Sequence, residues 1–285
     1  MFQVSTRAGV GGLETWALSD DASGAAVELV PSRGAIVTRF SVGDFAVLAL
    51  DEATLADPSK NVRGGIPVLF PTAGRLAGDR FGDYELKQHG FARNLPWTVV
   101  SQDTTDAARV TLALSASDET RARFPFEFAL TFTFSLAGQS LTIGQRYENR
   151  SDVPMPLHLG FHPYFFVPDG EKRATRIPTA ATRAYDNLHQ RDVAFTGFDL
   201  TQPEVDLHLV DHGGSRATLA RPNQPTIVLA GSPEFSSWVV WTLAGKDYVC
   251  LEPWTAPRNA LNSPDVRKIP PHASVALSLT IAVEK

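Results

Sequence analysis

Residues 157–166 place a histidine where its protonation can be tuned. The segment reads L-H-L-G-F-H-P-Y-F-F, so His162 lies among apolar and aromatic side chains. Such surroundings shift the pKa of an imidazole, and a pKa near neutrality suits a general acid or base. Pro163 favours extended or turn geometry here, which would let His162 project from the end of a strand. A packed histidine bonded to the backbone is the alternative interpretation.

A carboxylate near the C-terminus is the second candidate. Glu252 follows an apolar run and precedes Pro253 and Trp254. Ionised glutamate is rarely buried without a partner, and desolvation would raise its pKa and suit it to general base catalysis. Glu252 could instead be a strand-end charge in solvent. Asp206, within P-E-V-D-L-H-L at 203–209, would pass by itself as a surface residue.

Residues 60–93 form a basic segment within an acidic chain, with six Lys or Arg and three Asp or Glu. Two motifs lie within it, R-G-G-I-P at 63–67 and Q-H-G-F-A-R at 88–93. The glycines leave the backbone unobstructed, and Arg63, His89 and Arg93 supply donors for hydroxyl or phosphate oxygens. Scattered, solvated arginines are the alternative.

Several common catalytic motifs are absent from the sequence. It contains no G-x-x-x-x-G-K-[ST], G-x-S-x-G, C-x-x-C or H-E-x-x-H. Phosphate-binding loops, the nucleophile elbow of hydrolases and zinc sites of these types are therefore not expected. Gly9, Gly11 and Gly12 do not open a helix and are expected in a loop. The chemistry that remains is acid and base catalysis by histidine and carboxylate on a small molecule, which needs no cofactor.

The elements that must position these residues are strands. Apolar residues alternate with polar or small ones through 126–136, and the pattern resumes at 141–147 after Ala137, Gly138 and Gln139, which predicts a hairpin. Residues 274–283 alternate in the same way. Shorter candidate strands lie at 35–40, 46–50, 97–101, 109–116, 237–243 and 248–252.

Helices are nearly absent from this pattern. Only 51–60 and 118–123 could form a turn or two, so a doubly wound α/β sheet is excluded. The many alternating strands predict an all-β fold, a large antiparallel β-sandwich. Although the chain has 285 residues, sandwiches of that size occur as one domain, and no linker stands out, so residues 1–285 are expected to form a single domain.

Composition restricts the partners. The longest strictly apolar run, 45–50, is far shorter than the roughly 20 residues of a spanning helix, so no membrane association is expected. The start of the chain lacks an apolar signal segment, and the lone Cys250 cannot form an internal disulfide, so a cytoplasmic location is expected. A net charge of −5 argues against nucleic acid as a partner.

Taken together, four ordered motifs resemble the aldose 1-epimerase (galactose mutarotase-like) superfamily, including its hexose-6-phosphate mutarotase branch. They are R-G-G-I-P with F-P at 63–71, Q-H-G-F-A-R with Trp97, H-P-Y-F at 162–165 and E-P-W at 252–254. The resemblance covers nearly the whole chain and implies the large β-sandwich of that family.

The resemblance also implies roles for individual residues. His162 corresponds to the general acid of the family and Glu252 to its general base. His89 and Asp206 correspond to residues that bind sugar hydroxyls, and Arg63 and Arg93 to arginines at the far end of the pocket in the phosphate-using branch.

The remaining details leave the substrate open. Trp254 or Phe161 could pack on the apolar face of the sugar. The loop T-A-G-R at 72–75 lacks the aromatic often found in the phosphate-using branch, and Gly160 with Pro163 resembles enzymes for free sugars. The resemblance therefore implies a hexose or a hexose 6-phosphate as the substrate.

The resulting hypothesis is an isomerase that interconverts α and β anomers, with Glu252 as base and protonated His162 as acid. Two alternatives remain. One is a metal-dependent all-β enzyme in which His158, His162, His89 and Glu252 hold a metal ion. The other is a sugar-binding module without catalytic activity.

Overall fold

Alternation of apolar residues builds the central hairpin of one large sheet. In this computed structural model, which describes residues 1–284, the predicted hairpin is β11 (Phe128–Ala137) paired with β12 (Ser140–Asn149). Phe128, Leu130, Phe132, Phe134 and Leu136 are buried on one face of β11. The predicted C-terminal strand, β24 (Ser274–Glu284), pairs with the other edge of β12.

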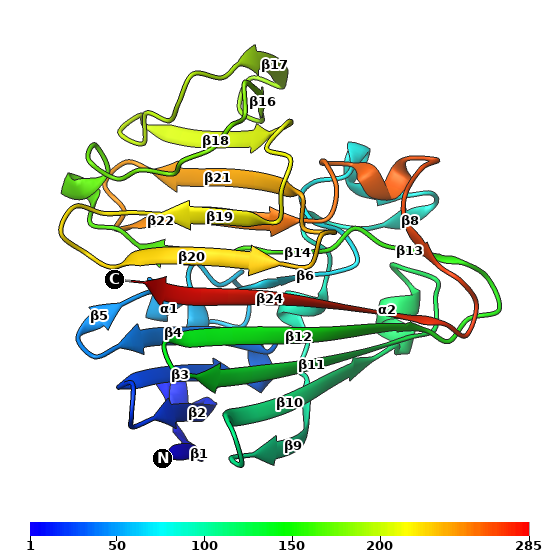
Figure 1. Cartoon of the computed structure of the whole chain (residues 1–285). Helices are drawn as coiled ribbons and strands as arrows, with labels where there is room; N and C mark the ends of the chain where they lie inside the picture. The colour runs from blue at the N-terminus through cyan, green and yellow to red at the C-terminus, as the bar shows by residue number, and fades with distance from the viewer. Residues whose placement is uncertain (285) are drawn as a thin grey trace.

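The hairpin belongs to a seven-stranded antiparallel sheet (Figure 1). Its other strands are, from one edge to the other, β19 (Arg216–Leu219) and β20 (Thr226–Gly231) before β24, then β10 (Ala108–Ser115) and β9 (Thr98–Asp103) after β11. The alternation predicted at 109–116 and 97–101 is thus confirmed, with bounds shifted by one or two residues.

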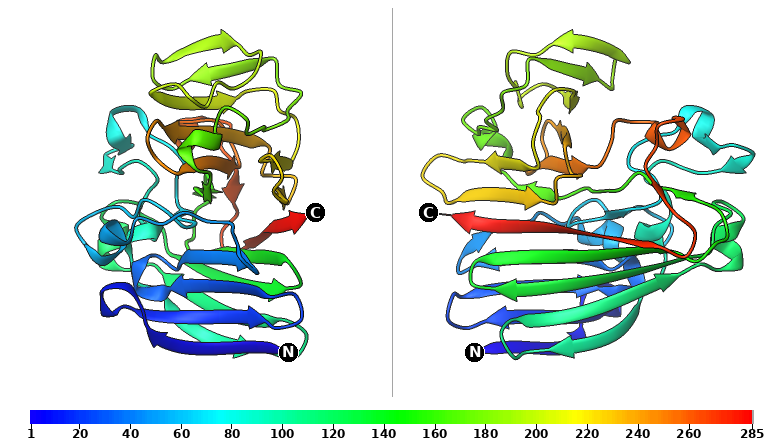
Figure 2. Two further views of the ribbon diagram at one scale, coloured as in Figure 1. Left: turned by 90° about the vertical axis from the view of Figure 1, so that its left-hand side faces the viewer. Right: turned by 45° about the vertical axis from the view of Figure 1, so that its right-hand side comes forward.

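Two further sheets pack against this one. The five-stranded sheet holds β1 (Phe2–Ala8), β2 (Glu14–Asp20), β3 (Ala25–Val30), β4 (Ile36–Val42) and β5 (Phe45–Ala46). It lies over β10 and β11 (Figure 2). Buried residues of all three sheets form one hydrophobic cluster, to which Val27, Phe132 and Leu251 belong. The predicted all-β sandwich is confirmed.

The third sheet, of eight strands, carries the candidate site. In order it contains β17 (Arg191–Ala194), β16 (Arg183–Asp186), β18 (Glu204–Leu209), β21 (Ser237–Leu243), β22 (Tyr248–Trp254), β14 (Gly160–Phe161) and β6 (Val68–Leu69), and β15 (Tyr164–Phe166) also pairs with β22. The strands predicted at 237–243 and 248–252 are confirmed, and β22 continues through Trp254.

The remaining elements are short. They are the strand pairs β13 (Met155–Pro156) with β23 (Lys268–Ile269) and β7 (Arg80–Phe81) with β8 (Tyr84–Glu85), and the helices α1 (Glu52–Ala56) and α2 (Asp118–Arg121). Asp51 caps α1 by accepting from two backbone N–H groups, and Ser117 forms a capping box with Thr120 on α2. No helix in residues 1–284 is long and apolar enough to cross a membrane.

One strand prediction was wrong in detail. The predicted strand at 46–50 is replaced by the two-residue β5 and by isolated bridges that pair Leu48 with Phe165 and Leu50 with Gly64. This segment crosses from the five-stranded sheet to the third sheet, so it pairs with two different partners. That residues 1–285 form a single domain stays a prediction.

The packing of β11 leads to a stability prediction. Phe132 is fully buried against Trp97, Tyr147 and Phe161. Truncation in Phe132→Ala removes this buried ring and leaves a cavity, so we expect the free energy of unfolding in urea to fall by about 3–5 kcal/mol. Thr131→Ala, on the opposite face of the same strand, serves as control and is expected to cost about 1 kcal/mol or less. Equal losses in the two variants would contradict this account of the core.

Candidate active site

The register of three strands places several polar and aromatic side chains on one face of the third sheet. Asp206 on β18 lies opposite Trp241 on β21, which lies opposite Cys250 on β22. Directly opposed residues project from the same face, and so do residues two apart on one strand. Glu252 and Trp254 therefore share this face with Asp206 and Trp241. The other face of the sheet packs into the core.

His162 reaches the same face from a break between two short strands. It lies between β14 and β15, and its backbone N–H donates to the carbonyl of Pro67 at 3.1 Å. The N–H of Tyr164 donates to the carbonyl of Gly65 at 2.9 Å. The R-G-G-I-P and H-P-Y-F motifs are thus hydrogen-bonded neighbours. Pro163 interrupts the strand as expected, and His162 projects from its end.

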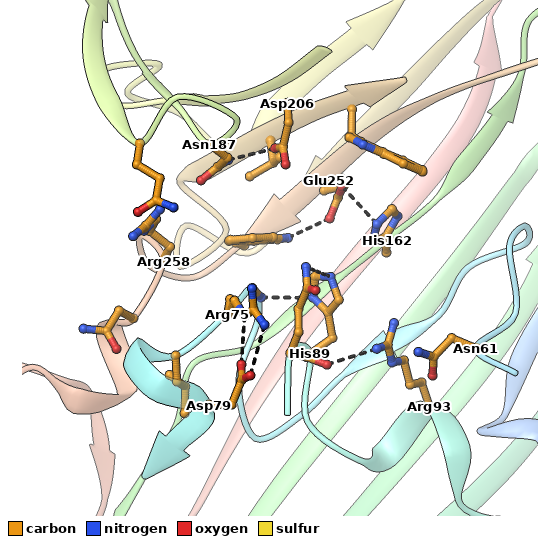
Figure 3. A pocket seen from close by; sticks show the side chains of 18 of the residues that line it. Asn61, Arg75, Asp79, His89, Arg93, His162, Asn187, Asp206, Glu252 and Arg258 are labelled. Atoms are coloured by element: carbon orange, nitrogen blue, oxygen red, sulfur yellow. Dashed lines mark hydrogen bonds and ion pairs between the residues drawn. The ribbon is translucent and has the colours of Figure 1, made fainter. Parts of the chain in front are cut away.

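His162 and Glu252 meet across the cavity floor (Figure 3). The Nε2 atom of His162 lies 3.3 Å from Oε1 of Glu252, and both side chains are buried. Burial lowers the pKa of His162 to about 3, assisted by the nearby positive charge of Arg93. Burial also raises the pKa of the Glu252 carboxyl well above its usual 4.5. Glu252 is therefore not a strand-end charge in solvent.

The cavity above this pair has a volume of about 690 Å³. All seven residues singled out from the sequence line it: His162, Glu252, His89, Asp206, Arg63, Arg93 and Trp254. Their convergence from segments up to 191 positions apart in the chain is what the resemblance required of a shared site. The catalytic and binding roles of these residues stay predictions.

His89 is held in a defined tautomer. Its Nδ1 accepts the backbone N–H of Gly74 at 3.0 Å, so the proton of the neutral ring is on Nε2. Nε2 lies 3.2 Å from the side-chain amide nitrogen of Gln88, which is also a donor, so this contact does not use the ring N–H as a hydrogen-bond donor. Burial lowers the pKa of His89 well below its usual 6.5, so the ring stays neutral. A neutral imidazole with a fixed N–H is suited to donate to a hydroxyl oxygen.

Asp206 lies farther along the cavity and is not the surface residue that its sequence context suggested. The side-chain amide of Asn187 donates to its Oδ1 at 2.8 Å. Burial raises the pKa of Asp206 to about 6, because the hydrogen bond from Asn187 only partly offsets desolvation. The carboxylate can accept hydrogen bonds from ligand hydroxyl groups.

Two arginines of the basic segment lie on one side of the cavity. Arg93 donates to the carbonyl of Gln88 at 3.0 Å, and its Nε is buried without a hydrogen-bond partner in the described chain. Burial lowers its pKa to about 10. Arg63 lies over the ring of Trp241, 5.8 Å from the ring centroid. Neither forms an ion pair with a carboxylate among residues 1–284, so both can bind an anion.

The suggestion that Phe161 contacts the sugar was wrong. Its side chain is fully buried in the core, where its ring packs against Phe132 and Phe235. As a neighbour of His162 along the chain, it points to the opposite face of the sheet. Trp254 lines the cavity, but its indole N–H donates to Oε2 of Glu252 at 3.1 Å.

The arrangement proposed for a metal site is not formed. Nε2 of His158 lies 2.7 Å from the carbonyl oxygen of Ala256, and His89 uses Nδ1 to accept from Gly74. Across residues 1–284, no three His, Cys, Asp or Glu side chains are placed together in a way that could hold a metal ion. The donor geometry therefore does not support the metal-dependent alternative.

Sequence reasoning missed several residues that line the cavity. Asn187, Gln190, Trp241 and Arg258 are examples. Arg258 lies on the side of the cavity away from Arg93 (Figure 3). Trp241 could have been found from its alternation with Val239 along the predicted strand at 237–243. Asn187 and Gln190 lie in the turn between β16 and β17, where no periodic signal exists.

Comparison with known proteins identifies the family of the chain. Residues 17–268 match the family described as aldose 1-epimerase. The Slr1438 protein of Synechocystis sp. PCC 6803, whose crystal structure is known, is 43% identical, with 95% of each chain covered and a TM-score of 0.91. A protein of Cenchrus ciliaris named "Putative glucose-6-phosphate 1-epimerase" is 28% identical over 73% of this chain and 68% of its own.

A more distant structure shares the fold. A galactose mutarotase-like protein from Clostridium acetobutylicum is 19% identical, covers 100% of this chain and 99% of its own, and superposes with a TM-score of 0.84. The family match covers residues 17–268 and therefore includes all four motifs, which lie between residues 63 and 254. The chain belongs to the aldose 1-epimerase family.

Proposed function

We propose that the protein is an isomerase that interconverts the α and β anomers of a hexose or hexose 6-phosphate. The observation that carries this proposal is the 3.3 Å contact between His162 Nε2 and Glu252 Oε1 on the floor of a cavity of about 690 Å³. One acid and one base, held side by side, are what anomer exchange needs at the two oxygens bonded to C1.

The two groups act as one proton-carrying pair. Burial favours the uncharged forms of both, and their contact lets one proton lie on either the carboxyl or the imidazole. The form with Glu252 ionised and His162 protonated is the reactive one. It differs from the uncharged form only by transfer of that proton across the contact.

Ring opening then follows from this form. Glu252 takes the proton of the C1 hydroxyl while His162 gives its proton to the ring oxygen. The bond from C1 to the ring oxygen breaks, and a carbonyl forms at C1. Rotation about the C1–C2 bond presents the other carbonyl face, and the same proton transfers in reverse close the ring. Each positioned group contributes roughly 10²–10⁴-fold.

Other residues would hold the sugar. His89 offers a fixed N–H, and the Asp206 carboxylate can accept from hydroxyl groups. C6 is bonded to C5, the second carbon attached to the ring oxygen. If His162 faces the ring oxygen, a substituent on C6 therefore extends past His162. The positive charges of Arg93 and Arg63 both act on His162, which makes this side suited to a 6-phosphate.

Removing the proposed base tests the mechanism directly. Glu252→Gln keeps the shape of the side chain but cannot take a proton, so we expect the anomerisation rate, followed by polarimetry, to fall about 100-fold or more. Glu204→Gln is the matched control, because Glu204 lines the same cavity and accepts from the Trp241 indole at 2.8 Å. The activity of the Glu204→Gln control should stay close to that of wild type.

A different result would favour the alternative of a sugar-binding module without catalytic activity. It is saturable sugar binding by wild-type protein without any acceleration of anomerisation.

The pair also sets the pH dependence. We expect kcat/KM to be bell-shaped, because the pair is active only while it carries one proton. Activity should fall as pH rises through the raised pKa of Glu252. On the acid side it should persist well below pH 6.5, since the pKa of His162 is lowered to about 3. The Asp206 carboxyl, with a pKa of about 6, is the other group that can titrate in this range. An acid limb near 6.5 that remains in Asp206→Asn would therefore refute this assignment.

The arginines predict substrate selectivity. If Arg63 binds a 6-phosphate, Arg63→Ala should lower the ratio of kcat/KM for glucose 6-phosphate to that for glucose by roughly 10–100-fold. Arg75→Ala is the control, because Arg75 lines the cavity but is ion-paired with Asp79 at 2.9 Å. Its effect on the ratio should be much smaller. An unchanged ratio in Arg63→Ala would remove the phosphate from the proposal.

A further inference from the structure

The two oxygens of Glu252 have different partners. Oε1 faces His162, and Oε2 accepts the indole N–H of Trp254 at 3.1 Å. Four other charged or titratable groups lie close enough for their charge, or the charge of Glu252, to affect a pKa: Asp206, Arg93, Tyr164 and Cys250. None of these four forms a hydrogen bond with it within residues 1–284. Trp254 is therefore the only described donor to the carboxylate besides His162.

The indole is fixed at both ends of its ring system. A Cβ added at Gly160 would lie 2.7 Å from Cδ1 on the five-membered ring. A Cβ at Gly74 would lie 2.7 Å from Cη2 on the six-membered ring, and Gly74 also has φ = +76°. Because real side chains cannot approach so closely, only glycine at these positions leaves room for the ring.

Three histidine rings pack around the Trp254 indole. The rings of His208, His158 and His89 lie nearly perpendicular to the indole, with centroids 5.4, 5.7 and 6.0 Å away. His208 is itself hydrogen-bonded to Ser237 and His158 to Ala256. Burial lowers the pKa of His208 to about 4 and of His158 to about 3, so both rings stay neutral. The indole cannot turn its N–H away from Glu252 without displacing anchored neighbours.

We propose that Trp254 is a positioning residue for Glu252, whose indole N–H orients the carboxylate and stabilises its ionised form. This inference rests on the proposed function, in which Glu252 is the base. It differs from the expected role of Trp254 as a platform for the sugar. Hydrogen bonds to an ionised acceptor are about twice as strong as neutral ones, so the donor favours the reactive form of the pair over the uncharged one.

The pH profile separates this role from simple packing. Trp254→Phe keeps an aromatic ring but deletes the donor, so ionisation of Glu252 becomes harder. We expect the alkaline limb of kcat/KM to move up by about one to two pH units. The plateau should fall about tenfold or more, because less of the pair is in the reactive form.

A second indole in the cavity provides the control. Trp241 donates to Glu204 in the same way that Trp254 donates to Glu252. Trp241→Phe should leave the alkaline limb at the wild-type pH, whatever it does to KM. A Trp254→Phe enzyme that loses activity at every pH with its alkaline limb unmoved would overturn the proposal.

A spectroscopic measurement covers the case in which Trp254→Phe does not fold. The chain has five tryptophans, so ¹⁵N-labelled protein should give five indole N–H signals. We expect one of them to shift with pH at the midpoint of the alkaline limb in wild type and to lose that shift in Glu252→Gln. Indole signals that are identical in their pH response in the two proteins would also overturn the proposal.

The two proposals fail in different ways. If wild-type protein does not accelerate anomerisation of any aldose, the proposed function fails, while the indole signal still reports whether Trp254 senses the charge of Glu252. If anomerisation is fast and depends on Glu252 but the indole does not respond, only the positioning role fails.

Discussion

A carboxyl group and an imidazole, both removed from water and touching each other, form the interaction on which the rest of this structure depends. Ionising either group alone in such surroundings would be costly. Their contact lets one proton serve both, and the fold supplies few other polar partners: an indole N–H for Glu252 and no partner for Nδ1 of His162 in the described residues. The interior of β22 and the break between β14 and β15 must meet accurately for this to hold.

The strands that could be predicted from sequence are those with one buried face and one face toward solvent. β11 alternates buried and half-buried residues, so its period of two is visible and its hairpin with β12 could be predicted. In β22 every residue is buried, because both faces of that strand are covered. Its existence could be predicted from apolar content, but neither the direction of Glu252 nor the register with β21 follows from a uniform pattern.

The candidate site shows the same division. The motifs that contain His89, His162 and Glu252 could be recognised because they are continuous in the chain. The hydrogen bonds between motifs depend on pairing between distant segments. Examples are those from His162 to Pro67 and from Tyr164 to Gly65, which connect the H-P-Y-F and R-G-G-I-P motifs. The role of the Trp254 indole depends on the space around it, to which segments far away in sequence contribute. Such long-range geometry has no local signal.

Gly74 gives this arrangement an unusual vulnerability. Its N–H sets the tautomer of His89, and its missing side chain makes room for the ring that holds Glu252. A single substitution there would therefore disturb both His89, which we propose binds sugar hydroxyls, and Glu252, which we propose is the base. Over evolutionary time the two proposed roles are not free to change independently, since the loop at 72–75 contacts both residues. If the proposed function holds, variation in sugar preference would have to arise at other residues that line the cavity, such as Gln190 and Arg258.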